Sequence, residues 1–404
     1  MPASSLTRAL RATRTQFAAL GLISGIWGVH IPTIKQQYGL GEASLSLVLL
    51  SVALGAVVML LGAGRLIDRL GVRAAALLAV LTMSAMLALA LHWPSLPALL
   101  PSMLLFGAAM SLFDVAINTE GSALEALGSR AIMGNLHGCF SLGGMAGAAA
   151  GALLLRLHWP AALQLAVIGL LIASAGSLAA RAMLASHPQP AADEAAAPFS
   201  WPRGPLLVLG LLIFAAMSAE GAMYDWSVLY LEQELKLPQD RAALGYAVFA
   251  AAMALARLFG DRLRERHAER RLLRIGGGMA ALAMAVALLS AHPLLALLGY
   301  GATGAGLALS APILYNAATR VPGTTRAAAI ASVTTVGYSG FLLGPPLIGA
   351  LAQGCGLGWA LCVVVLGSAL LAWGARFVPQ ASKDEHSLRC PPDFASQRTD
   401  LMPP

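Results

Sequence analysis

The chain alternates between long apolar runs and short polar segments. Each run contains mainly Leu, Ala, Val, Met and Gly, and its roughly 18 to 25 residues suffice for a helix to cross a hydrocarbon core of about 30 Å. The period-two alternation of a membrane β-barrel is missing from these runs. We therefore predict twelve transmembrane helices, over residues 16–35, 44–64, 72–91, 97–120, 131–154, 160–181, 205–231, 241–259, 272–290, 293–317, 328–352 and 357–377.

The composition agrees with a membrane protein. Of the 404 residues, 58% are hydrophobic and 11% are charged, whereas soluble proteins average about 25% charged residues. The four cysteines show no CxxC spacing, so we expect neither a disulfide framework nor a metal site. A P-loop, an HExxH motif and a nucleophile elbow are also missing from the sequence, so we expect no enzyme activity and no cofactor.

The positive charges are unevenly distributed. If the N-terminus is cytoplasmic, 22 of the 26 Lys and Arg residues fall on the cytoplasmic side, and only Lys35, Arg156, Lys236 and Arg241 fall on the other. This distribution follows the positive-inside rule and predicts an inner (plasma) membrane protein with both termini in the cytoplasm. The net charge of +7 therefore orients the chain, and we expect no nucleic-acid partner.

The two halves of the chain resemble each other. A shift of 198 residues places Asn118 on Asn316, and it places Phe140-Ser141 on Tyr338-Ser339. Parallel repeats of this kind build transporters that rock around a central site. We predict an all-α membrane fold of two six-helix halves, residues 1–185 and 205–379, with a cytoplasmic linker at 186–204 and a disordered cytoplasmic tail at 380–404.

The fourth run contains a carboxylate, Asp114, which shares one helical stripe with Ser111 and Asn118. A charge at membrane depth is costly, so this stripe should face an interior cavity. Asp114 is our first candidate for proton coupling, and a permanently protonated or salt-bridged structural acid is the alternative. We expect Glu120 and Glu125 to be solvated at the cytoplasmic exit.

The seventh run contains two further acids. Glu220 and Tyr224 share a face, whereas Asp225 lies about 140° around the helix from Glu220. The two acids can face one cavity only if the helix is broken, which Gly221 would permit. Glu220 is the second proton-coupling candidate, and Asp225 is expected near the outer mouth.

The remaining polar and aromatic candidates lie in five of the runs. His30 and His137 either line the cavity or are hydrogen-bonded into helix packing. The predicted substrate-binding residues are Trp27, His30, Asn118, His137, Tyr224, Tyr315 and Asn316. The spacing of Gly143, Gly147 and Gly151 predicts a close contact between two helices.

The segment "GRLIDRLGVR", Gly64 to Arg73, resembles the loop signature of the major facilitator superfamily, and it stands between the second and third runs. The resemblance implies secondary transport by alternating access. The motif predicts a latch that holds one conformation, and the alternative is that its arginines only set the topology. The predicted latch residues are Gly64, Asp68, Arg69, Gly71 and Arg73, with Asp261 and Arg262 as their counterparts in the second half.

The segments "FDVAIN" and "GIWGVHIPTIKQQYGL" resemble the fucose permease branch of the superfamily, in which the acid of the first segment is implicated in proton coupling. Gly28 stands where that branch has a sugar-binding aspartate, which argues against fucose, and against sugars generally, as the substrate.

We therefore predict a monomeric proton-coupled symporter, whose partners are a small polar solute, protons and the lipid bilayer. A proton-driven multidrug or metabolite exporter and a transporter-derived sensor are the alternatives.

Overall fold

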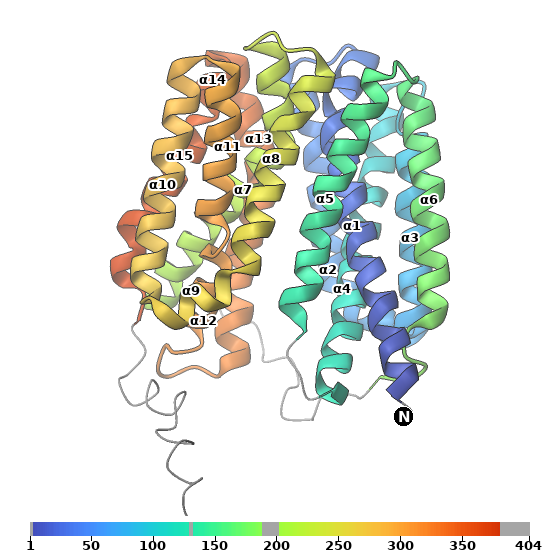
Figure 1. Ribbon diagram of the computed structural model, residues 1–404, viewed down its shortest axis with the longest axis vertical. Helices are drawn as coiled ribbons and strands as arrows, with labels where there is room; N and C mark the ends of the chain where they lie inside the picture. The colour runs from blue at the N-terminus through green and yellow to red at the C-terminus, as the bar shows by residue number, and fades with distance from the viewer. Residues whose placement is uncertain (1–2, 129–131, 188–201, 380–404) are drawn as a thin grey trace, which may run out of the picture.

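The computed structural model describes residues 3–128, 132–187 and 202–379, and those residues contain helices and no strand (Figure 1). In chain order the elements are α1 (Ala3–Gln37), α2 (Glu42–Leu70), α3 (Val72–Leu89), α4 (Leu96–Gly128), α5 (Met133–Arg156), α6 (Ala161–Ala182), α7 (Pro205–Gln233), α8 (Gln239–Leu258), α9 (Gly260–Arg266), α10 (Glu269–Ser290), α11 (Pro293–Leu307), α12 (Ser310–Ala318), α13 (Arg326–Cys355), α14 (Leu357–Ala360), α15 (Cys362–Gly374) and the 3-10 helix η2 (Ala375–Phe377).

The prediction of twelve membrane-spanning helices is confirmed. In the described part of the chain, twelve helical segments are long and apolar enough to cross a membrane, and each coincides with one predicted run. The largest differences are at α1, which begins at Ala3, and at α4, which continues to Gly128. Charged and polar residues in these two extensions interrupt the apolar pattern, but their helix propensity allows the helix to continue.

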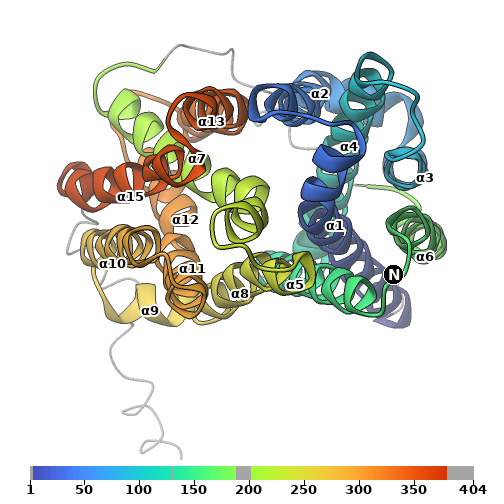
Figure 2. The same cartoon turned by 90° about the horizontal axis from the view of Figure 1, so that it is seen from above.

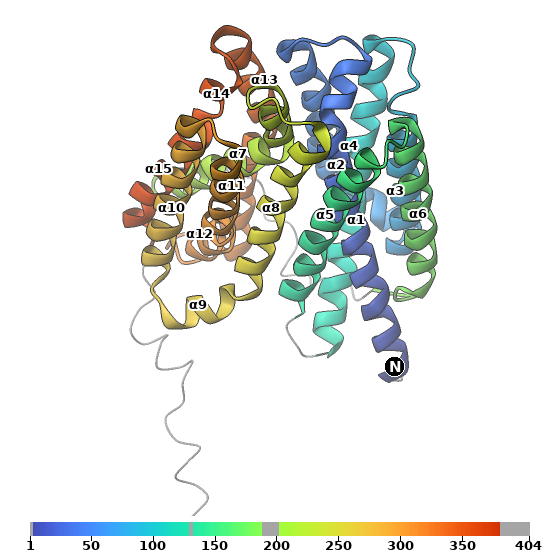
Figure 3. The ribbon, with the colours of Figure 1, turned by 45° about the horizontal axis from the view of Figure 1, so that its top comes forward.

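Two bundles stand side by side (Figure 2). Helices α1 to α6 form one bundle and α7 to α15 form the other, and the bundles meet where α5 packs against α8 and α2 packs against α13. We call the end of the molecule at which α1 begins the terminal face. The opposite end, which carries the connections at residues 38–41 and 234–238, is the far face (Figures 1 and 3).

Glycines let α1 and α5 approach closely. A Cβ atom added at Gly143 would lie 2.2 Å from the Ala18 carbonyl oxygen, and one at Gly147 would lie 2.3 Å from that of Leu22. Gly21 makes the reciprocal approach, since its Cβ would lie 1.9 Å from the Phe140 carbonyl oxygen. Backbone is therefore packed directly on backbone along this contact, as small residues permit between membrane helices.

We predict that Gly147→Val destabilises the protein, because its side chain would collide with the α1 backbone and force the two helices apart. Overpacking of this kind costs about 1–3 kcal/mol. The melting temperature of the purified protein measures the effect. Gly62→Val is the matched control, since a Cβ at Gly62 meets no atom within 4 Å. Equal melting temperatures for the two variants would contradict the close packing.

Candidate functional site

A cavity of about 350 Å³ lies where the two bundles meet. Its wall contains residues of α1, α2, α4 and α5 from the first bundle and of α7 and α13 from the second. Most of the wall is apolar or aromatic. Its polar side chains are Ser24, Ser111, Asp114, Asp225 and Tyr338.

Asp114 and Ser111 both line this cavity, on the same face of α4. The side-chain amide of Asn118, one turn further along, donates to the Asp114 carboxylate at 3.0 Å and to its carbonyl oxygen at 2.8 Å. Among the described residues, no Lys, Arg or His forms an ion pair with Asp114. The carboxylate therefore combines access to the cavity with one neutral hydrogen-bond donor, so it can gain or lose a proton without breaking an ion pair.

The two acids of α7 point in different directions. Helix α7 is continuous through Gly221, so the offset of about 140° between Glu220 and Asp225 is retained. Asp225 lines the same cavity as Asp114. Glu220 accepts hydrogen bonds from the Arg257 guanidinium of α8 at 3.2 and 3.4 Å, and it is absent from the cavity wall. The structure thus brings Asp225, which the sequence placed near the outer mouth, to the site.

Helix α1 contributes Trp27 but not His30 to the cavity wall. The Trp27 ring packs against Phe106 of α4 with 5.4 Å between the ring centroids. His30 is completely buried, and its Nδ1 lies 3.0 Å from the Ile26 carbonyl oxygen. The side chain of His30 is therefore part of the packing inside the first bundle.

His137 and Tyr224 also lie outside the cavity wall. The His137 ring packs edge-on against Phe17 at 5.3 Å between centroids. The Tyr224 ring is tilted against that of Tyr246 and edge-on to that of Phe249, both of α8, at 5.1 and 5.2 Å between centroids. Both side chains take part in aromatic contacts that hold neighbouring helices together.

Asn316 belongs to a polar cluster between α9, α10 and the end of α12. Its side-chain amide donates to Glu269 at 3.0 Å, and Glu269 also forms ion pairs with Arg264 and Arg320. Tyr315 precedes Asn316 on α12 and is likewise absent from the cavity wall. The sequence equivalence of Asn118 and Asn316 is therefore not matched by equivalent contacts.

The residues of the predicted latch take different roles. Gly71 separates α2 from α3 and has a φ of 81°, a conformation that favours glycine. Arg73 donates to the Met183 carbonyl oxygen at the end of α6. Asp68 and Arg69 are exposed beside Gly64, with no hydrogen bond or ion pair for Asp68 among the described residues.

In the second half, Arg262 is exposed, and the side chain of Asp261 lies outside the described part of the structure.

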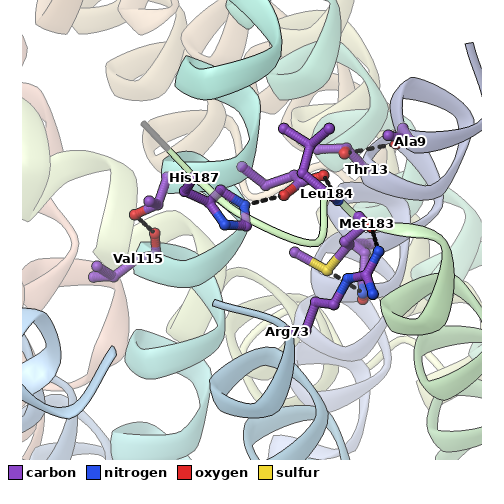
Figure 4. A network of polar contacts seen from close by, with 10 residues as sticks. Ala9, Thr13, Arg73, Val115, Met183, Leu184 and His187 are labelled. Atoms are coloured by element: carbon purple, nitrogen blue, oxygen red, sulfur yellow. Dashed lines mark hydrogen bonds and ion pairs between the residues drawn. The ribbon is translucent and has the colours of Figure 1, made fainter. Parts of the chain in front are cut away.

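Glu120 is completely buried, so the expectation that it is solvated was wrong. Its carboxylate accepts a hydrogen bond from the Leu184 backbone N–H at 2.7 Å and pairs with the His187 ring (Figure 4). The chain after α6 folds back over the end of α4 and supplies these partners, which a reading of α4 alone cannot reveal. Glu125 likewise bonds backbone, accepting from the N–H groups of Ile132 and Met133 at 2.7 and 3.0 Å.

Within residues 3–128, 132–187 and 202–379, no group of three or more His, Cys, Asp or Glu side chains is placed to hold a metal ion. The charged residues of the cavity wall are Asp114 and Asp225. Their carboxylates can exchange protons and accept hydrogen bonds.

Comparison with known proteins relates the chain to a family of transporters. The family model described as Major Facilitator Superfamily matches residues 15–321 and 206–393. An uncharacterised MFS-type transporter of Yersinia pestis is 35% identical over 375 residues, which cover 91% of this chain and 95% of that protein.

Solved structures share the fold. The D-xylose-proton symporter superposes with a TM-score of 0.75 at 12% identity, covering 93% of this chain and 98% of that one. The fucose:proton symporter of E. coli superposes with a TM-score of 0.64 at 15% identity, covering 92% of this chain and 98% of that one.

We predict that Glu220→Gln destabilises the protein by about 2 kcal/mol, because Arg257 would lose its counter-charge in apolar surroundings. Thermal unfolding of the purified protein measures the loss. The double variant Glu220→Gln/Arg257→Met should recover part of it, since no unpaired charge remains. An unchanged melting temperature for the single variant would show that the ion pair has no structural role.

Proposed function

Because the chain belongs to the Major Facilitator Superfamily, we propose that this multi-pass membrane protein is a secondary active transporter that moves a small polar solute by alternating access. The observation that carries the proposal is the cavity between the bundles, to which each bundle contributes one carboxylate, Asp114 and Asp225. A site at the interface is exposed to either side of the membrane when the bundles rock against each other.

We propose that the terminal face is cytoplasmic and that the membrane is the inner (plasma) membrane. The support is the charge distribution, since 22 of the 26 Lys and Arg residues then lie on the cytoplasmic side. The far face is then the outer one.

In the described state the outer side is held closed by contacts between the bundles. Gln36 at the end of α1 donates to Glu232 of α7 at 2.9 Å. Gln239 at the start of α8 donates to the Val29 carbonyl oxygen at 2.9 Å and to the Thr33 hydroxyl at 2.8 Å. Opening the cavity to the outside requires these three hydrogen bonds to break.

Proton coupling is assigned to Asp114 because its carboxylate borders the cavity without a cationic partner. A charged side chain at the centre of a membrane helix costs about 3 kcal/mol, and protonation removes that cost. Neutral Asp114 therefore permits the cavity to lose water and close, whereas charged Asp114 favours the hydrated, open state. Glu220, the second predicted proton carrier, is held by Arg257, and Asp225 is the better-placed partner for Asp114.

The lining indicates the kind of solute. A volume of about 350 Å³ lies in the range of small-molecule sites. Asp225, Ser24, Ser111 and Tyr338 supply hydrogen-bonding groups, and the remaining wall suits an apolar part of the solute. Among the predicted substrate contacts, Trp27 stands in this wall.

The other predicted contacts stay proposals for later steps of the cycle. Asn118 would act through the Asp114 carboxylate that it binds. His30 would support the cavity wall from inside the first bundle. The other residues, His137, Tyr224, Tyr315 and Asn316, would meet the solute only after the bundles have moved. The exposed Asp68 would engage as a latch when the cytoplasmic side closes, by accepting hydrogen bonds from the start of a helix of the second bundle.

We predict that Asp114→Asn abolishes gradient-driven accumulation of the solute but spares its exchange between the two sides, because a side chain that cannot ionise cannot carry the proton. The solute is first identified by a thermal-shift screen of sugars, nucleosides, organic acids and peptides at two pH values. Transport is then measured in vesicles with and without a pH gradient. Asp240→Asn, outside the cavity wall, is the control and should accumulate normally. Normal accumulation by Asp114→Asn would contradict the assignment.

We predict that Gln239→Ala shifts the protein towards the state that is open on the outside. Each hydrogen bond contributes about 1 kcal/mol, so the loss of two should raise the open population about thirtyfold. A cysteine placed at Ser24, with the native cysteines changed to serine, reports the shift as faster labelling by an impermeant thiol reagent from outside. Gln233→Ala is the matched control, and equal labelling rates in the two variants would contradict the closure.

A further inference from the structure

A second cavity lies far from the solute site, at the terminal face of the second bundle. It has a volume of about 430 Å³ and is lined by Arg270, Arg271 and Arg274 of α10, together with Trp373 and Arg376 at the end of the last span. Helices α10 and α15 stand at the outer edge of their bundle, away from α1 to α6 (Figure 2). The cavity therefore opens where the molecule meets the surrounding membrane.

The charged residues of this wall are all cationic. Four guanidinium groups line the cavity, and no Asp or Glu is among its lining residues. Glu269, next to Arg270 in the chain, is already bound by Arg264, Arg320 and Asn316. Because like charges repel at short range, four arginines around one cavity are stabilised by an anion between them.

Two contacts position the arginines at the rim of the cavity. Arg270 donates through Nε to the Val378 carbonyl oxygen at 2.5 Å, which uses one of its five N–H donors. The Arg376 guanidinium lies over the Trp373 ring, 3.8 Å from its centroid. The first contact joins α10 to the end of the last span, and the second holds Arg376 against a ring of its own segment, so the charges come from two separate segments.

The depth of the cavity corresponds to the headgroup layer of a bilayer. The ninth span begins at Glu269 and the twelfth ends at Phe377, so the arginines lie at the boundary between the apolar core and water. The Trp373 side chain is 56% exposed and that of Phe377 is 46% exposed. Exposed aromatic rings at this depth are typical of the membrane interface. Exposed Ile275 and Leu370 continue the apolar surface along α10 and α15.

We propose that this cavity binds the phosphate headgroup of an anionic phospholipid, whose acyl chains lie against α10 and α15. Topology alone requires cations on one side of the membrane, but it does not require them to surround a cavity beside an exposed tryptophan. Arginine pairs with phosphate through two parallel N–H donors, and basic pockets between membrane helices are suited to such headgroups.

The test compares three probes on the full-length protein, delipidated in an uncharged detergent. Short-chain phosphatidylglycerol, short-chain phosphatidylcholine and inorganic phosphate are titrated separately, and the melting temperature and the number of bound lipids by native mass spectrometry are recorded. We expect phosphatidylglycerol to bind and stabilise, and phosphatidylcholine to do so at least tenfold more weakly. Stabilisation by inorganic phosphate at equal concentration would overturn the lipid as the ligand.

The double variant Arg271→Gln/Arg274→Gln should weaken phosphatidylglycerol binding at least tenfold, because it removes two of the four cationic groups that would attract the anionic headgroup. Both side chains are exposed, so the variant should unfold at the wild-type temperature before lipid is added. Arg8→Gln/Arg11→Gln is the matched control, with the same spacing and exposed side chains on α1. Equal loss of binding in both variants, or no loss in the first, would overturn the site.

Discussion

The cost of placing a carboxylate at membrane depth governs how the polar residues of this protein are arranged. Glu220 is paired with Arg257 across α7 and α8. Glu120 is completely buried and receives the Leu184 N–H and the His187 ring. Asp114 has only a neutral amide as its donor and faces a cavity. The first two acids are held by fixed partners, whereas Asp114 has no charged partner among the described residues, which is why the proposed proton exchange is assigned to it.

The sequence predicts the spans well because the thickness of the hydrocarbon core sets the minimum length of each apolar run. It also predicts that Ser111 and Asp114 face the cavity, since the helical period places them on one stripe. The choice between Glu220 and Asp225 required more than this period. The angle between the two residues follows from the sequence, but the rotation of α7 relative to its neighbours depends on packing against α8 and α13. His30 illustrates the same limit, because its position on α1 is fixed while the face that α1 turns inward is not.

The internal repeat predicts architecture better than it predicts chemistry. Asn118 and Asn316 coincide when the halves are aligned, yet Asn118 binds Asp114 and Asn316 binds Glu269. Asp114 lies on the same helix as Asn118, whereas Glu269 lies on α10 and not on the helix of Asn316. Glu269 also pairs with two arginines. Backbone positions can therefore be shared by both halves while each half assigns its polar side chains separately. Under the proposed function, the proton-exchanging Asp114 lies in the first bundle, whereas its repeat-related region in the second bundle holds the ion pairs of Glu269.

Glycines bring backbone against backbone inside the first bundle, whereas side-chain hydrogen bonds join the two bundles at the far face, and the proposed rocking depends on this difference. Inside the first bundle, α1 and α5 are in direct backbone contact through glycines. A distortion of this bundle would therefore break many van der Waals contacts at once. Between the bundles, the far face is closed by three hydrogen bonds and by Gly349 of α13, where an added Cβ would lie 2.4 Å from the Ser46 side chain of α2. Hydrogen bonds of about 1 kcal/mol each amount to a few kcal/mol. Protonation of one carboxylate at membrane depth changes the free energy by a similar amount. Under the proposed function, a change in the protonation of Asp114 is therefore large enough to shift the interface between its closed and open states, while each bundle moves as a rigid unit.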